Sequence, residues 1–277
     1  MTTPRPQPGP APAGGPPLSV WPTAQRDARA QRRGRYLPES TPHPGKMLPA
    51  IAATAIARYT RPGDLVADPM CGIGTTLVEA AYLGRRGLGI EYEDRWAKVA
   101  AANVARARQR GAPGTAEVIR GDARELPALL PPDVPGTAAL VVTSPPYGAS
   151  VHGQVSAEQR RDAAGGVRKY DNRYGDDPAN LASRRLDELL DGFTQILAGC
   201  AALLRPGGLA VITARPWRQH GVRRSLGEQS RHLVLLICCR RSGGRFRVMV
   251  AQQCGFCPAE LSAAACRVQL GHEFPVG

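Results

Sequence analysis

Two short polar stretches carry residue types that could bind a nucleotide and do chemistry beside it. Residues 68–76 read DPMCGIGTT, and residues 143–147 read TSPPY. Each follows an apolar run, 65–67 or 139–142, that is typical of a buried parallel strand. Ligands of open α/β sheets bind beyond the carboxyl ends of strands, where the strand order reverses. We therefore expect the two stretches to meet in one crevice.

The first stretch resembles a nucleotide-binding loop, although not the dinucleotide-binding kind. A dinucleotide fingerprint has three glycines in the pattern GxGxxG, whereas Leu77 follows Gly72 and Gly74 at the third position. The two glycines let the backbone approach a ligand closely, because they have no Cβ. Asp68 supplies a carboxylate for a cationic group. Glu91 ends the next apolar run, where an acid can accept hydrogen bonds from two ribose hydroxyls.

The second stretch resembles the catalytic motif of methyltransferases that modify amino groups of nucleic-acid bases. Its Ser-Pro-Pro-Tyr sequence is typical of enzymes that act on N4 of cytosine, and residues 68–76 resemble the S-adenosylmethionine loop of the same family. The resemblance extends over about residues 43–216. It implies an amino-directed, S-adenosylmethionine-dependent DNA methyltransferase, including the restriction–modification type. It also implies a Rossmann-like, doubly wound class I methyltransferase fold with a mostly parallel α/β sheet.

Under this resemblance, the catalytic residues are expected in the second stretch. Ser144 and the Pro145 carbonyl accept hydrogen bonds from the amino hydrogens, which returns electron density to the nitrogen and points its lone pair at the methyl group. Pro145 and Pro146 stiffen the loop and leave carbonyls free, because proline has no N–H. Tyr147 stacks on the base, which must be flipped out of a duplex. Methyl transfer is then direct and in line, without a covalent enzyme intermediate.

The resemblance also places a larger set of residues around S-adenosylmethionine. A His-Pro segment helps to close the pocket, an Asp after the third strand lies beside the adenine, and a helix N-terminus suits the methionine carboxylate. Taken alone, the His could equally be a loop residue and the Asp part of a turn. The expected cofactor-binding residues are His43, Lys46, Asp68, Pro69, Cys71, Gly72, Gly74, Thr75, Thr76, Glu91, Asp122 and Thr143.

The composition favours a polyanionic partner and a reducing compartment. The 277 residues include 36 Lys and Arg against 23 Asp and Glu, a net charge of +13 that suits phosphates, although a basic surface can also be simple solvation. The seven cysteines have no regular spacing, and Cys254 and Cys257 lack a second pair for a zinc site. No run reaches the ~18 apolar residues of a membrane span, and no signal-peptide core begins the chain. We expect a cytoplasmic protein that binds nucleic acid, without a metal or a membrane partner.

The chain divides into four expected parts. Residues 1–20, rich in Pro, Gly and Ala, are expected to be disordered. Residues 21–46 form a basic arm, residues 47–216 the catalytic domain, and residues 217–277 a divergent C-terminal segment. The arginines of the arm fit either contacts with phosphates or a solvated leader; they are Arg26, Arg29, Arg32, Arg33 and Arg35.

Within the catalytic domain, four helices are expected, and each follows a polar loop or a turn. Asp94 is expected to cap the second helix after the cofactor loop, and a long helix is expected to end before the Pro-Gly-Gly turn at 206–208. In the terminal segment, residues 232–239 and 245–250 fit an antiparallel hairpin at the sheet edge. The expected helices span 48–59, 75–83, 94–110 and 181–204, and the remaining strands 117–122 and 208–213.

Residues 149–180 form a long polar insertion after the catalytic motif. Loops of this length without secondary structure are usually functional or disordered. Aromatic side chains can stack on bases while cations hold phosphates. The expected nucleic-acid-binding residues of this insertion are Arg160, Arg161, Arg168, Lys169, Tyr170, Arg173 and Tyr174.

Three functions are compatible with the sequence. DNA is the favoured substrate, with N4 of cytosine ahead of N6 of adenine. A tRNA guanine-N2 methyltransferase is the nearest alternative, although that group more often carries Asp at the position of Ser144. A nucleic-acid-binding module with a retained but inactive methyltransferase fold is the third.

Overall fold

The structure is a computed structural model, and it describes most of the chain between Trp21 and Pro275. The described residues are 21, 23–146, 154–155, 169–170, 174–214, 217–219, 222–224, 232–240, 245–253 and 270–275. The backbone alone is described for 154–155, 169–170, 186 and all residues after 213. The expectation of disorder for residues 1–20 falls outside the described residues.

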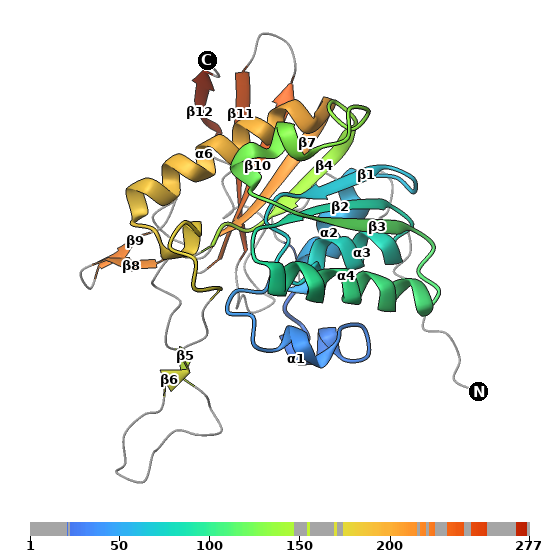
Figure 1. The fold of residues 1–277 in the computed structure, drawn as a ribbon. Coiled ribbons are helices and arrows are strands. Elements are labelled where there is room, and N and C mark those ends of the chain that lie inside the picture. The colour runs from blue at the N-terminus through green and yellow to red at the C-terminus, as the bar shows by residue number, and fades with distance from the viewer. Residues whose placement is uncertain are drawn as a thin grey trace, which may run out of the picture.

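In the described part of the chain, one main sheet has eight strands (Figure 1). These strands are β1 (Leu65–Asp68), β2 (Arg86–Glu91), β3 (Thr115–Arg120), β4 (Ala138–Thr143), β7 (Leu204–Ala214), β10 (His232–Arg240), β11 (Arg245–Gln253) and β12 (Leu270–Pro275). Two small antiparallel pairs join β5 (Gln154–Val155) to β6 (Lys169–Tyr170), and β8 (Trp217–Gln219) to β9 (Val222–Arg224).

The order of the strands reverses between β1 and β4. The sheet reads β12-β11-β10-β7-β4-β1-β2-β3, so the chain first moves outward from β1 to β3 and then returns to the other side of β1. β3, β2, β1, β4 and β7 pair in parallel, whereas β10, β11 and β12 pair antiparallel. The Rossmann-like doubly wound fold is therefore confirmed, and β10 and β11 form the expected C-terminal hairpin.

Helices cover both faces of the parallel part of the sheet (Figure 1). The longer ones are α2 (Pro49–Tyr59), α3 (Thr75–Tyr82), α4 (Asp94–Gln109) and α6 (Leu186–Leu203). The shorter ones are α1 (Ala28–Arg32), α5 (Leu126–Leu129) and the 3-10 turns η1 (Pro38–Ser40), η2 (Ala123–Glu125) and η4 (Leu181–Ser183).

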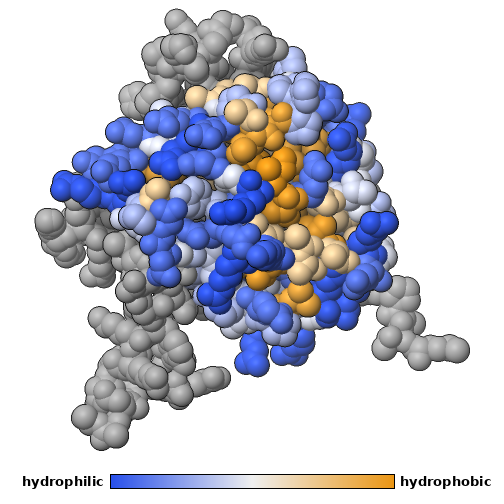
Figure 2. Space-filling view, in the orientation of Figure 1, coloured by the Kyte–Doolittle hydropathy of each residue, from blue (hydrophilic) through white to orange (hydrophobic). Residues whose placement is uncertain are grey.

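Successive side chains of β1 point to opposite faces of the sheet, so they belong to two separate parts of the core. Leu65 and Ala67 pack with residues of α5 and α6, whereas Val66 packs with α2 and α3. This is the period of two that a strand imposes on its side chains. On the face seen in Figure 2, an apolar area lies over α5 and the neighbouring strands, because the four-residue α5 covers less of the sheet than a long helix would.

Two expected helix boundaries were wrong. Asp94 is the first residue of α4 and not its cap; Glu93 occupies the cap position, and no side chain caps the helix there. The long helix expected over 181–204 is split, because the Asn180 side chain caps η4 by accepting from Ala182 N, and the extended backbone of Arg184 interrupts the helix before α6. β7 then begins at Leu204, earlier than expected.

The N-terminal arm packs against the catalytic core, which excludes a solvated leader for its described residues. Trp21 and Tyr36 are 6% and 7% exposed. The buried Asn103 of α4 links the arm to the cofactor loop: its Oδ1 accepts from Leu37 N at 2.8 Å, and its Nδ2 donates to Ser40 Oγ and the Ile73 carbonyl, both at 2.9 Å. The arm therefore supports the loop from outside the sheet.

Among the described residues, every helix is too short or too polar to span a lipid bilayer. No group of three or more His, Cys, Asp or Glu side chains among them is placed to hold a metal ion.

We expect Asn103→Ala to lower the free energy of unfolding by about 1–3 kcal/mol, because it leaves a buried N–H and a buried carbonyl without their partners. Urea unfolding of both proteins measures the difference. Arg108→Ala, an exposed substitution on the same helix, is the control and should change stability little. Equal losses in the two variants would show that Asn103 does not connect the arm to the loop.

Candidate functional site

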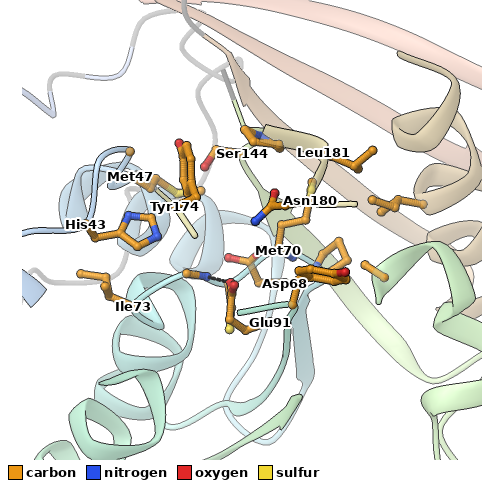
Figure 3. Close-up of a pocket in the computed structure, with 18 of the residues that line it drawn as sticks. His43, Met47, Asp68, Met70, Ile73, Glu91, Ser144, Tyr174, Asn180 and Leu181 are labelled. Atoms are coloured by element: carbon orange, nitrogen blue, oxygen red, sulfur yellow. Dashed lines mark hydrogen bonds between the residues drawn. The ribbon is translucent and has the colours of Figure 1, made fainter. Parts of the chain in front are cut away.

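A cavity opens where the strand order reverses, at the carboxyl ends of β1, β2 and β4 (Figure 3). Its volume is about 830 Å³, including the mouth that is open to solvent. The residues that follow β1 and β4 both reach it, so the two sequence stretches meet as predicted.

Asp68 ends β1 and joins it to α3 and β4. Its carboxylate is 3% exposed and accepts from Thr76 Oγ1 at 2.7 Å, from Thr143 Oγ1 at 2.8 Å and from Met70 N at 3.1 Å. Burial raises the pKa of Asp68 to about 6, and these three donors offset only part of that effect. The carboxylate therefore fixes the cofactor loop and the catalytic stretch relative to each other.

Glu91 ends β2 and closes the cofactor loop from the opposite side. Its Oε2 accepts from Gly72 N at 2.8 Å, a bond drawn in Figure 3, and its Oε1 accepts from Glu93 N at 2.9 Å. Burial, with a smaller effect of the nearby charges of Asp68 and Glu93, raises the pKa of Glu91 to about 7, although the two hydrogen bonds from backbone N–H groups lower it. A carboxylate so placed has remaining lone pairs for hydroxyl donors in the cavity.

The loop between β1 and α3 can hold a flat or extended ligand close to its backbone. Gly72 has φ +54°, and a Cβ there would lie 2.9 Å from His43 Nε2. The first hydrogen bond of α3 runs from Val78 N to the Gly74 carbonyl, at 2.9 Å. The N–H groups that precede Val78 in the first turn therefore have no acceptor within the helix. Such a helix end suits a carboxylate or phosphate.

His43 packs behind the loop and is neutral. It is 4% exposed and contacts Trp96 and Tyr174 edge to face, with ring centroids 4.6 and 5.3 Å apart. Burial, with the cation of Lys46 nearby, lowers the pKa of His43 to about 3. Lys46 Nζ itself donates to the Thr41 carbonyl at 2.8 Å and to the His43 carbonyl.

Residues 174–181 close another side of the cavity against the start of α4. Trp96 Nε1 donates to the Tyr174 carbonyl at 2.5 Å, Tyr92 Oη donates to Asp177 Oδ2 at 2.6 Å, and Asn180 Nδ2 donates to Glu93 Oε1 at 2.6 Å. We call residues 174–181 the closing segment. Figure 3 shows Tyr174, Asn180 and Ser144 together, across the cavity from Glu91.

The structure gathers most of the expected cofactor residues, but not all of them, at the cavity surface. Gly74, Thr76 and Thr143 do not line it. Thr76 and Thr143 are buried and bond to Asp68, so they support the wall from behind. Gly74 faces Ala100, 3.2 Å from where its Cβ would be. The expected cofactor residues that do line the cavity are His43, Lys46, Asp68, Pro69, Cys71, Gly72, Thr75, Glu91 and Asp122.

Asp122 lies in the wall as an ion pair with Arg124. Arg124 Nε donates to both Asp122 oxygens at 2.9 Å, and its NH2 lies 2.5 Å from Oδ2. Burial would raise the pKa of Asp122, but the hydrogen bonds and the charge of Arg124 outweigh it, so that the pKa is lowered. The carboxylate is therefore ionised at neutral pH.

The catalytic stretch is partly described. Ser144 and Pro146 line the cavity, whereas Pro145 is not among its lining residues. Tyr147 lies outside the described residues, as do Arg160, Arg161, Arg168 and Arg173. Only the backbone of Lys169 and Tyr170 is described, in β6. Tyr174 contacts His43 in the cavity wall, and its expected role at nucleic acid stays a prediction.

Several lining residues had no place in the sequence-based expectation. Most of them stand beside predicted residues in the chain, next to Lys46, Glu91 or Asp122 or inside the loop 68–76, and that proximity was the available signal. No local signal marked residues 179–181 and Ile196, because their positions depend on tertiary packing. The unexpected lining residues are Gly45, Met47, Met70, Ile73, Tyr92, Ala123, Arg124, Ala179, Asn180, Leu181 and Ile196.

We expect the affinity for S-adenosylmethionine to fall as the pH falls through about 7. A carboxyl with a pKa of about 7 is mostly ionised at pH 8 and mostly protonated at pH 6, and the ionised form is the better acceptor for ribose hydroxyls. If only that form binds well, the dissociation constant rises roughly tenfold between pH 8 and pH 6.

Calorimetric titration at several pH values tests this expectation. Glu91→Gln should bind about tenfold more weakly at pH 8 and lose most of the pH dependence, with a smaller remainder from Asp68, whose pKa is about 6. Glu117→Gln, an exposed substitution on β3, should keep the wild-type profile. A flat wild-type profile would remove Glu91 from the cofactor site.

Comparisons with known proteins find matches that include the first half of the parallel sheet. Residues 4–102, which contain β1, α3 and β2, match the family model described as DNA methylase. A tRNA (guanine(10)-N2)-dimethyltransferase of Methanothermobacter thermautotrophicus is 33% identical over 123 residues, which cover 43% of this chain and 34% of the relative. The enzyme of the same name from Methanocaldococcus jannaschii is 32% identical over 109 residues, covering 39% and 30%. The chain thus spans about a third of the length of these relatives.

The solved structures with a similar fold are less similar to this chain in sequence than the two curated relatives are. TrmN from Thermus thermophilus is 21% identical, with a TM-score of 0.46 over 80% of this chain and 52% of that one. Geranyl diphosphate methyltransferase in complex with SAM is 17% identical, with a TM-score of 0.36 over 60% and 48%. With the family match and the two curated relatives, the resemblance to amino-directed nucleic-acid methyltransferases, related to tRNA guanine-N2 methyltransferases, is confirmed.

Proposed function

We propose that the protein is an S-adenosylmethionine-dependent methyltransferase that acts on the exocyclic amino group of a nucleic-acid base. The observation that carries the proposal is the Asp68 carboxylate, which bonds to Thr143 at 2.8 Å and to Thr76 at 2.7 Å. It holds Ser144, the next residue after Thr143, at the same cavity as the cofactor loop.

The cavity has groups that fit each part of S-adenosylmethionine. The backbone of Gly72 lines the cavity, Glu91 offers a carboxylate for the ribose hydroxyls, and Asp122 stands on the wall expected for the adenine. The free N–H groups at the start of α3 suit the methionine carboxylate. When bound, the cofactor supplies an electrophilic methyl group on a cationic sulfur.

Ser144 orients the nitrogen that is to be methylated. Its hydroxyl oxygen accepts a hydrogen bond from the amino group, with the Pro145 carbonyl as a second acceptor. Both interactions localise the lone pair on nitrogen and direct it at the methyl group. Orientation alone can account for several kcal/mol of the barrier to reaction. The bond from Thr143 to Asp68 keeps this stretch from moving away from the loop.

Two substrates remain candidates, each with its own support. The serine at position 144 favours DNA, and within DNA the N4 amino group of cytosine, ahead of N6 of adenine. The names of the two curated relatives favour N2 of guanine in tRNA. The basic chain, with a net charge of +13, suits either polyanion.

Transfer of a labelled methyl group tests the proposal directly. The full chain is incubated with labelled S-adenosylmethionine and with either duplex DNA or unmodified tRNA, and the nucleosides are then separated. N4-methylcytosine or N6-methyladenine identifies a DNA enzyme, and N2-methylguanine identifies a tRNA enzyme. Cofactor binding without transfer to either polymer would contradict the proposal and support a binding module.

We expect Ser144→Ala and Tyr147→Ala to suppress methyl transfer while the affinity for S-adenosylmethionine stays near that of the wild type. Ser144→Ala removes an acceptor for the amino hydrogens. Tyr147→Ala removes a stacking face that is worth about 1–3 kcal/mol per base in single-strand binders. Tyr147→Phe keeps the face and should retain much of the activity.

Single-turnover rates and cofactor titrations of the same variants separate the two effects. Ser183→Ala, which removes an exposed hydroxyl in η4, is the control. Normal transfer by both Ser144→Ala and Tyr147→Ala would mean that residues 143–147 are only a turn.

A further inference from the structure

A second hollow lies on the N-terminal arm, apart from the cofactor cavity. It is formed by residues 23–35, the first turn of α2 and the middle of α3, and has a volume of about 1,160 Å³ that is widely open to solvent. We call it the arm groove. Its polar walls are made by Gln25, Arg26, Gln31, Arg33, Arg35 and Glu79.

The arm is held in place before any ligand arrives. Gln31 bonds to the carbonyls of Thr23 and Arg26 at 3.0 and 2.8 Å, and its Oε1 accepts from Ala50 N at 2.9 Å. Tyr36 Oη donates to Glu79 Oε1 at 2.7 Å. A partner of this groove therefore meets a formed surface and loses little affinity to ordering it.

The arginines of the arm have two different environments. Arg32 turns inward and donates to the Met47 carbonyl, and burial lowers its pKa. Arg35 pairs with Glu79 at 2.7 Å. Arg26 and Arg33 are exposed, and neither forms an ion pair with any residue that the structure describes.

Glu79 does not cancel the positive charge of the groove. Its carboxylate already accepts from Arg35 and Tyr36, and burial raises its pKa. Three guanidinium groups and one carboxylate leave a net charge of +2 at most pH values, and the +2 is carried at the exposed rim by Arg26 and Arg33. Guanidinium groups match phosphate oxygens in geometry and in charge.

We propose that the arm groove binds the phosphodiester backbone of the nucleic-acid substrate, through Arg26 and Arg33. This rests on the proposed function, because a polynucleotide substrate is what would supply the phosphates. The groove and the cofactor cavity share α3: the helix starts at the cavity with Thr75 and reaches the groove with Glu79, about 6 Å further along its axis. The two sites are therefore close together, and the proposal places phosphates of the strand at the groove while its target base is in the cavity.

The test compares two double variants of the full chain that lose the same charge. Arg26→Gln/Arg33→Gln removes the two exposed cations of the groove. Arg61→Gln/Arg86→Gln removes two exposed arginines at the amino ends of β1 and β2, the end of the sheet opposite the cavity. Thermal unfolding checks that both variants keep wild-type stability, which the exposure of all four side chains leads us to expect.

Binding of fluorescent duplex DNA, single-stranded DNA and RNA oligonucleotides is measured by anisotropy over a series of salt concentrations. We expect Arg26→Gln/Arg33→Gln to bind about tenfold more weakly at 0.1 M salt. Its log–log salt dependence should flatten by about 1.8 on duplex DNA and about 1.4 on single strands, since two phosphate contacts are lost. Arg61→Gln/Arg86→Gln should retain the wild-type slope, and the polymer with the largest effect identifies the source of the phosphates.

The outcomes separate this inference from the proposed function. Equal slopes in the two double variants would overturn the groove as a phosphate site, even if methyl transfer occurs normally. A flattened slope confined to Arg26→Gln/Arg33→Gln would support the groove, even if the wild-type protein transferred no methyl group. Failure of the wild-type protein to bind any of the three polymers would overturn the groove as well.

Discussion

The buried carboxylate of Asp68 is the constraint on which the rest of the site depends. It ends β1, yet its hydrogen bonds reach the first turn of α3 and the last residue of β4. The reversal in strand order makes β1 and β4 neighbours. The hydrogen bonds of the carboxylate then fix the distance between the loop after β1 and the residues after β4. Burial without those donors would leave an uncompensated charge, which a protein interior does not tolerate. The two threonines are therefore as necessary to the site as the residues that face the cavity.

Most of the parallel sheet could be predicted from the sequence, because its signals are local. Apolar runs before polar loops marked β1, β2 and β4, and the polar end of β3 marked the adenine side. The cofactor loop was recognisable from Gly72 and Gly74, whose positive φ values of +54° and +77° explain why glycine stands there. Strands and glycine turns both depend on local backbone geometry, which the types of the neighbouring residues indicate directly.

The closing segment could not be predicted, because its position depends on contacts between distant parts of the chain. Tyr174 lies next to His43 although 131 positions separate their numbers, and Asn180 bonds to Glu93 across 87. The mixture of Tyr and basic residues before it favoured nucleic acid as the partner of Tyr174. Similarly, the arginine-rich arm gave no sign that Arg32 and Arg35 face inward while Arg26 and Arg33 face solvent. Charge patterns report composition, whereas burial is decided by packing.

The closing segment has a consequence for access to the cavity. Residues 174–181 are held by hydrogen bonds to Tyr92, Glu93, Trp96 and Arg124, and two of these, from Tyr92 to Asp177 and from Asn180 to Glu93, involve partly or fully exposed side chains. Segments held in this way open with a much smaller free energy than the sheet that supports them. Local opening of this wall would therefore leave β1, β2 and β4 folded, and it would widen the mouth through which the cavity already reaches solvent.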